Sequence, residues 1–187
     1  MEEKKMHPDL ESILYTEQQL AEAVQALGRK ITEDYQGKEL VMVCILKGAA
    51  PFFTDLIRCI DLPMNIDFMA VSSYGASTTT TGEVKLVKDM SYSVAGKDVI
   101  IVEDIVDSGM TLSYLKKVFV DRQTNSVRIS TLMDKPKRRD PKITLEPDYK
   151  CFTIPDAFVV GYGLDYAEKY RNLPYVGILA PRIYEKK

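Results

Sequence analysis

The sequence predicts an α/β domain with a mainly parallel, twisted sheet flanked by helices. Continuous apolar runs at 41–46 and 98–103 are typical of strands buried on both faces. Stretches with helical spacing follow them at 50–60 and 110–120, and this alternation indicates a parallel sheet. The length of 187 residues, with 45% hydrophobic and 28% charged residues, fits one globular domain.

The first elements come before residue 61. Apolar residues recur at helical spacing from Ser12 to Lys30, where Gly28 is expected to weaken the end of the helix. The buried strand 41–46 follows and stops at a Lys-Gly pair. The next helix is expected at 50–60, since Pro51 is tolerated in its first turn.

The middle of the chain continues the alternation. A strand is expected at 65–71, and the small, polar stretch 72–83 is long enough for a lid or binding loop. The stretch 84–90 alternates like a strand. The buried strand 98–103 then precedes the helix at 110–120.

The last third supplies the remaining strands. They are expected at 126–134, 157–162 and 175–180, with a basic, Pro-bounded loop at 135–142. In such sheets, ligands bind outside the carboxyl ends of the strands. The residues just after each buried run are therefore the candidate site.

Composition excludes several classes of protein. The 25 Lys and Arg against 27 Asp and Glu, with a pI near 5.6, exclude a generally basic nucleic-acid binder. The longest apolar stretch, 41–46, is far short of the ~20 residues of a membrane span, and the polar start does not resemble a signal peptide. The sole histidine, His7, excludes a histidine-based metal cluster. Three cysteines without CxxC spacing indicate free thiols in a cytoplasmic protein: Cys44, Cys59 and Cys151.

The sharpest chemical signal is VIIVEDIVDSGMTL, residues 99–112. A hydrophobic strand runs into Glu103 and Asp104, and a short loop from Asp107 to Thr111 leads into a helix. Hydroxyls, a glycine and the N–H groups of the helix start suit a phosphate monoester. Two carboxylates would repel a phosphate, so the acid pair must face sugar hydroxyls or a hydrated metal ion. Together the two halves describe a site for a ribose 5-phosphate.

A structural explanation competes with this interpretation. The acid pair would then be a solvated strand end, and the Ser-Gly-Met-Thr turn an ordinary helix cap. An acid pair alone would favour that explanation. The combination of a buried strand, three acids and this turn within one short segment favours the functional one.

The segment 99–112 resembles the phosphoribosyl-pyrophosphate loop of type I phosphoribosyltransferases, and Asp107 points to their hypoxanthine-guanine (6-oxopurine) branch. The resemblance extends over nearly the whole chain. LKG at 46–48 is similar to the pyrophosphate loop, with a cis peptide after Leu46, and SSYGASTTTTGEVK at 72–85 to the mobile catalytic loop. LMDK at 132–135 and the segment 155–179 resemble the base-binding hood.

The resemblance implies the fold of that family and its reaction. This is magnesium-dependent transfer of the 5-phosphoribosyl group from phosphoribosyl pyrophosphate to hypoxanthine or guanine, giving IMP or GMP and pyrophosphate in purine salvage. It implies one domain over 1–187, with a core at about 35–155 and a hood from the N-terminal segment and about 156–187. A homodimer or homotetramer is expected, with small-molecule substrates and neither nucleic acid nor membrane as partner.

The same resemblance assigns roles to individual residues. Asp107 would act as general acid/base beside N7 of the purine, with Ser73 and Tyr74 on the catalytic loop. Mg²⁺ would be held by Asp165, through water, and by Glu103 and Asp104, which also bind the ribose hydroxyls. The 5-phosphate would be held by Asp107, Ser108, Gly109, Met110 and Thr111; the base by Lys135, Phe158 and the Val159 backbone; and the pyrophosphate by Lys47, Gly48 and Arg171.

The chemistry of the side chains fits these roles. A positioned carboxylate can accept the proton that a purine nitrogen loses as it attacks. A carbon losing pyrophosphate becomes cation-like, so magnesium and Arg171 would stabilise the departing charge, and the 72–83 loop would close as a lid against water. The Lys135 ammonium can only donate, which suits a 6-oxo group and rejects the 6-amino group of adenine.

Some residues have plain structural explanations as well. Lys135 lies in a basic run up to Arg139, and most such charges form a solvated face, so the base contact is given to Lys135 alone. Phe158 in an apolar strand is typical core. Asp165 and Arg171, six residues apart, do not share a helical face. The stretch 161–167 lacks the third small residue of a dinucleotide fingerprint, and no P-loop motif occurs.

Other classes stay open. A signalling receiver domain also has an acid pair at a strand end, but near its start, whereas this pair lies past the midpoint. A non-catalytic regulator could keep the fold and the phosphoribosyl site. Among enzymes, adenine and orotate relatives lack an acid at the position of Asp107, which makes them weaker alternatives, while xanthine use stays open.

Overall fold

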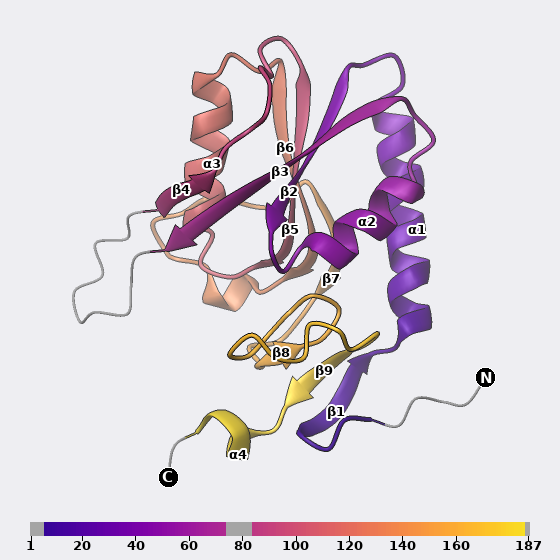
Figure 1. The fold of residues 1–187 in the computed structure, drawn as a ribbon, viewed down its shortest axis with the longest axis vertical. Coiled ribbons are helices and arrows are strands. Elements are labelled where there is room, and N and C mark those ends of the chain that lie inside the picture. Colours follow the sequence, from indigo (N-terminus) through magenta and orange to yellow (C-terminus); the bar gives the residue numbers. More distant parts are fainter. Residues whose placement is uncertain (1–5, 74–83, 186–187) are drawn as a thin grey trace.

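Six strands form the larger sheet, in the order β4-β3-β2-β5-β6-β7 (Figure 1). Neighbouring strands are parallel, except that the edge strand β4 runs antiparallel to β3. The computed structural model describes residues 6–73 and 84–185. The strands of this sheet are β2 (Leu40–Leu46), β3 (Met64–Ser73), β4 (Val84–Lys88), β5 (Asp98–Val106), β6 (Ser126–Asp134) and β7 (Tyr149–Thr153).

Helices cover both faces of this sheet, which confirms the predicted fold class (Figure 1). Met42 and Cys44 of β2 face the core beneath α1 and α2, while Val43 and Ile45 face the core beneath α3. Since both faces are covered, the whole strand is apolar. The helices are α1 (Glu17–Asp34), α2 (Ala50–Arg58) and α3 (Met110–Asp121).

The order of strands reverses between β2 and β5. From β2 the chain passes through α2 to β3 on one side, and from β5 through α3 to β6 on the other. The carboxyl ends of β2 and β5, at Leu46 and Val106, therefore flank a topological switch point. Such a point is where open α/β sheets bind ligands.

A second, three-stranded antiparallel sheet has the order β1-β9-β8. It joins the start of the described chain to its last third, and in Figure 1 it lies below the larger sheet. Its strands are β1 (Leu10–Tyr15), β8 (Val159–Val160) and β9 (Val176–Leu179), followed by the short helix α4 (Pro181–Tyr184).

The helix expected from Ser12 is wrong at both ends. Residues up to Tyr15 form β1, and α1 begins after Thr16, whose Oγ1 accepts a hydrogen bond from Gln19 N at 3.3 Å. Gln19 Oε1 accepts one in return from Thr16 N at 2.9 Å, so a capping box sets the start. The helix also runs past Gly28 to Asp34, and Gly28 packs against Cys59, just after α2, rather than ending the helix.

The strand predictions were correct in place, with three differences. Strand β5 extends to Val106 rather than ending at the acid pair. The runs 157–162 and 175–180 contribute to the second sheet, with short strands. Strand β7 was not predicted, because YKCFT is short and does not alternate clearly. In the basic stretch 135–142, Pro136–Arg138 forms one 3₁₀ turn.

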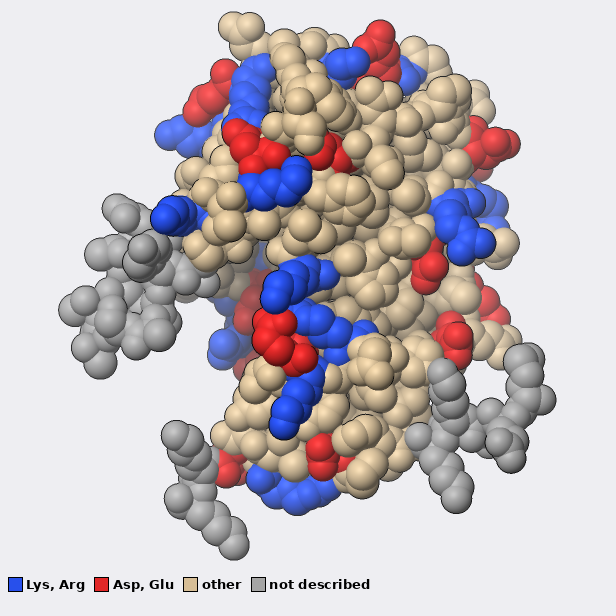
Figure 2. Space-filling model, viewed as in Figure 1, with Lys and Arg blue, Asp and Glu red and all other residues tan. Residues whose placement is uncertain are grey.

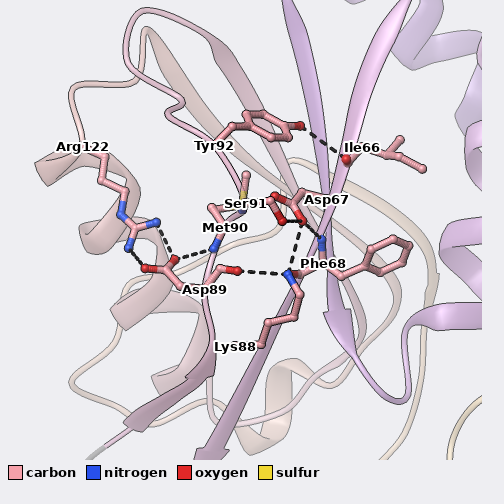
Figure 3. Close-up of polar contacts among 9 residues, drawn as sticks. All are labelled: Ile66, Asp67, Phe68, Lys88, Asp89, Met90, Ser91, Tyr92 and Arg122. Carbon is pink, nitrogen blue, oxygen red and sulfur yellow. Dashed lines mark hydrogen bonds and ion pairs between the residues drawn. The ribbon is translucent and has the colours of Figure 1, made fainter.

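A polar cluster fixes the β3–β4 edge (Figure 3). The Asp67 carboxylate, 5% exposed, accepts hydrogen bonds from the N–H groups of Phe68 and Ser91 at 2.7 and 2.6 Å, and Lys88 Nζ lies 3.4 Å away. Burial raises its pKa, but these hydrogen bonds and the Lys88 charge outweigh burial and leave the pKa below its ordinary value. Beside it, Arg122 binds both oxygens of Asp89 at 2.7 Å and ties this edge to α3.

Surface charge is mixed. On the face in Figure 2, basic and acidic side chains are interspersed and no broad basic area is seen. Within 6–73 and 84–185, no helix is long and apolar enough to cross a membrane. All three cysteines are free thiols, as predicted.

Candidate active site

Two adjoining cavities open at the carboxyl ends of β2 and β5. The larger, of about 470 Å³, reaches from Gly48 to the loop after β5, and the smaller, of about 250 Å³, reaches to Lys135 and Phe158. They are neighbours because four residues line both: Asp104, Ile105, Asp107 and Asp165. The structure thus brings together the main candidates predicted from separate segments.

The acid pair lies within strand β5 and lines the larger cavity. Asp104 Oδ1 accepts a hydrogen bond from Ile105 N at 2.7 Å, and Glu103 Oε1 accepts one from Asp104 N at 3.3 Å. Burial, followed by the charge of Asp104, raises the pKa of Glu103 well above its usual range. Burial also raises the pKa of Asp104. Two crowded carboxylates of this kind favour a cationic or hydrogen-donating ligand.

The loop after β5 has the geometry of an anion site. Gly109 caps α3 with φ +82°, a conformation that favours glycine. Ser108 Oγ accepts from Met110 N at 3.4 Å, and Ser108 and Thr111 both line the larger cavity. Since the N–H groups at the start of α3 lie at this cavity, the helix terminus favours a phosphate there.

Arg139 supports this loop from beneath, a role that the sequence did not reveal. Its Nη1 donates to the Asp107 carbonyl at 2.7 Å and its Nη2 to the buried carboxylate of Asp134 at 2.5 Å, while its side chain is 9% exposed. Asp140 N donates to the Ser108 carbonyl at 3.1 Å. The expectation of a solvated face is therefore wrong for Arg139, although Lys137 and Arg138 are exposed.

Gly48 lies where β2 meets the acid pair. A Cβ built on it would be 1.7 Å from Asp104 Oδ2 and 3.6 Å from Arg171 Nη1, so no side chain fits at this position. The peptide between Leu46 and Lys47 is cis, as expected. Gly48, Asp104 and Arg171 thus form one wall of the larger cavity.

A network of charges joins the second sheet to this wall. Arg171 Nη2 lies 2.8 Å from Asp165 Oδ1 and 3.2 Å from Glu168 Oε1, and Glu168 Oε2 lies 3.0 Å from Lys47 Nζ. Sequence spacing alone could not link Asp165 to Arg171. The turn between them, closed by the bridge Tyr166–Lys169, brings them together. Glu168 was also missed, and no sequence pattern indicates it, because this segment consists of turns rather than a helix.

Besides the three aspartates that it shares with the larger cavity, the smaller cavity is lined by one cation and several apolar side chains. Lys135 Nζ donates to the Ala157 carbonyl at 2.7 Å, and burial lowers the pKa of this lysine. Phe158 is 38% exposed, so it is not the core residue that its apolar strand suggested. Val159 and Leu164 complete the wall. A flat, partly apolar ligand with a hydrogen-bond acceptor fits these groups.

Two predicted catalytic residues lie at the edge of the described part of the chain or beyond it. The backbone of Ser73 ends β3 and pairs with Val84. Tyr74, like most of the predicted lid, lies outside the described residues.

The carboxylates of Glu103 and Asp104 suit a hard divalent cation that also keeps water and substrate oxygens as ligands. They do not form a site in which protein side chains alone surround the metal. In the described part of the chain, no group of three or more His, Cys, Asp or Glu side chains is placed to hold a metal by itself. Mg²⁺ is usually bound by one or two carboxylates together with water and substrate oxygens. The crowded Glu103–Asp104 pair, with its raised pKa values, is a donor set of that kind.

Comparisons with known proteins agree on one family. The family model described as phosphoribosyl transferase domain matches residues 11–167. Hypoxanthine-guanine phosphoribosyltransferase of Bacillus subtilis is 51% identical over 180 residues, covering 96% of this chain and 99% of that protein. The bifunctional protein TilS/HprT of Listeria innocua is 51% identical over 183 residues, and the chain spans 28% of its length. The crystal structure of a hypoxanthine phosphoribosyltransferase from Staphylococcus aureus matches with a TM-score of 0.93 and 49% identity, covering all of both chains.

Proposed function

This chain belongs to the phosphoribosyl transferase family, and from that premise we propose that it is a hypoxanthine-guanine phosphoribosyltransferase of purine salvage. It transfers the 5-phosphoribosyl group of phosphoribosyl pyrophosphate to hypoxanthine or guanine and gives IMP or GMP with pyrophosphate. The observation that carries the proposal is the pair of adjoining cavities, one lined by an anion loop and an acid pair, the other by Lys135 and Phe158.

The phosphoribosyl group fits the larger cavity. The 5-phosphate accepts hydrogen bonds from the loop 107–111 and the start of α3, and the ribose hydroxyls donate to Glu103 and Asp104. The backbone of Lys47 and Gly48, together with Arg171, holds the pyrophosphate. In support, the buried Nε of Arg171 has no hydrogen-bond partner within the described residues.

The purine fits the smaller cavity, which belongs to the base-binding hood formed with the second sheet. Its ring stacks on Phe158, its 6-oxo group accepts from Lys135 Nζ, and the backbone of Val159 reads another edge. Because Lys135 can only donate, the 6-amino group of adenine is disfavoured.

Asp107 lies on the wall of both cavities, where the purine nitrogen meets the anomeric carbon. We assign it as the general base that takes the proton of the attacking purine. Ser73 and Tyr74 on the preceding loop close over the reacting groups and exclude water.

Mg²⁺ is the proposed cofactor, held by Glu103, Asp104 and, through water, Asp165. When bound, it neutralises charge on the pyrophosphate. Arg171 adds its fixed positive charge on the same side, beside Asp104 and Gly48. We also infer a cytoplasmic enzyme, since its three cysteines are free, and a homodimer or homotetramer.

An ultraviolet assay with phosphoribosyl pyrophosphate, magnesium and each of four bases tests the proposal. Turnover of hypoxanthine and guanine, none of adenine, and loss of activity with a chelator are expected. Turnover of xanthine would widen the substrate range without changing the mechanism. Tight binding of phosphoribosyl pyrophosphate without turnover of any base would instead favour a regulator.

A further inference from the structure

The aromatic surroundings of Phe158 extend beyond the two cavities. The ring of Tyr184, in α4, stacks on Phe158 with centroids 5.1 Å apart and 23° between the planes. The ring of Tyr166 meets Phe158 edge-on, with centroids 5.5 Å apart at 88°. Phe158 is therefore held by two tyrosines from segments that come after it in the chain.

Tyr184 contacts Phe158 from outside the lining of the two cavities. Phe158 lines the smaller cavity, whereas Tyr184 and Tyr166 line neither cavity. An aromatic ring has two faces, and Tyr184 covers one of them. Because Phe158 is exposed in part and lines the smaller cavity, a ring bound there would stack on the face that Tyr184 leaves free, and Tyr184, Phe158 and the bound ring would form three successive layers.

The position of Tyr184 is fixed by contacts with the other end of the chain. Ala180 N donates to the Asp9 carbonyl at 2.9 Å, and the Arg182 guanidinium donates to the Pro8 carbonyl. Within α4, Ile183 N donates to the Ala180 carbonyl at 2.9 Å. Tyr184 also packs against the small core of Leu10, Val160, Tyr175 and Leu179.

We propose that Tyr184 is a positioning residue for the purine, acting through Phe158; this rests on the function proposed above. A partly exposed phenylalanine loses rotamer freedom when a base stacks on it, which weakens binding. Tyr184 holds the Phe158 ring in place before the base binds. Part of the rotamer freedom of Phe158 is therefore already lost in the enzyme without ligand. The effect reaches the base and leaves the phosphoribosyl group, in the larger cavity, untouched.

Calorimetric titration with IMP and with ribose 5-phosphate separates these two parts of the ligand. Tyr184→Leu keeps an apolar side chain but removes the stacked ring, so Phe158 must be ordered when the base binds, and ordering one side chain costs roughly 0.5–1.5 kcal/mol. We expect IMP to bind ~3–10-fold more weakly and ribose 5-phosphate to bind within about twofold of the parent. Tyr184→Phe restores the ring and the affinity. Tyr114→Leu, at a half-exposed tyrosine of α3, is the matched control.

A second test uses the Phe158→Leu variant as the starting protein. In a Phe158→Leu protein, adding Tyr184→Leu should change IMP affinity no further, because Tyr184 acts through Phe158. Unchanged IMP affinity in the single variant Tyr184→Leu, or an equal loss for IMP and ribose 5-phosphate, overturns the positioning role. A parent protein that binds IMP no better than ribose 5-phosphate overturns the proposed function instead, and the positioning role with it.

Discussion

Replacing Gly48 with alanine perturbs the acid pair without touching an acidic residue. The new Cβ would lie 1.7 Å from Asp104 Oδ2, whereas real Cβ contacts begin near 3.0 Å. The carboxylate must therefore move by about 1.3 Å, the difference between these two distances. Its other oxygen is held by Ile105 N at 2.7 Å, so a simple rotation is opposed.

A misplacement of ~1 Å in a catalytic site typically lowers the rate by ~10²-fold. For Gly48→Ala we expect kcat/KM with hypoxanthine to fall by about that factor, equivalent to ~2.7 kcal/mol. The assay is the initial rate by ultraviolet absorbance at several concentrations of phosphoribosyl pyrophosphate. Gly96→Ala is the control, since nothing lies within 4 Å of its Cβ although its φ of +74° strains alanine; its kcat/KM should match the parent.

A double-mutant cycle identifies the cause. Asp104→Ala removes the atoms that the new Cβ would meet, so adding Gly48→Ala to it should lower kcat/KM little further. If the losses of the two single variants multiply in the double variant, Gly48 does not act through Asp104. The reasoning also fails if Gly48→Ala alone keeps the parent rate.

Three further predictions concern single side chains. Asp107→Asn should lower kcat by ~10²-fold or more while phosphoribosyl pyrophosphate still binds, as measured by steady-state rates and calorimetry; unchanged turnover would remove the general base from Asp107. Lys135→Ala should weaken purine binding by ~1–3 kcal/mol and relax discrimination against adenine. If the variant keeps the KM values of the parent protein for all bases, Lys135 does not contact the base. Asp67→Asn should lower the free energy of unfolding by ~1–3 kcal/mol at pH 7 in urea titrations. Because the folded pKa of Asp67 lies below its unfolded value, this stabilisation is fully present above pH ~4 and is lost as the pH falls through the folded pKa, so a difference between the two proteins that does not shrink as the pH is lowered contradicts the assignment.

The sequence located the parts of the site that are local in the chain. The stretch from Glu103 to Thr111 contains a strand, a turn and a helix start, so the sequence alone could place these residues together at one candidate site. The buried strands were equally clear, because both faces of the larger sheet are covered by helices.

Contacts between residues that are distant in the chain could not be predicted from the sequence in this way. Arg171 meets Asp165 through turns in which residues such as Ala167 and Glu168 have positive φ, which no periodicity predicts. Arg139 is buried because Asp134, fully buried at the end of β6, offers it a carboxylate. Strand β1 was mistaken for helix because its pairing partner, β9, lies at the other end of the chain.

A crystal structure with bound IMP tests the central claim most directly, namely that one nucleotide spans both cavities. The account predicts the phosphate in the loop 107–111, the purine against Phe158, and the 6-oxo group within hydrogen-bond distance of Lys135 Nζ. A nucleotide whose phosphate lies elsewhere, or whose base leaves the smaller cavity empty, would contradict it.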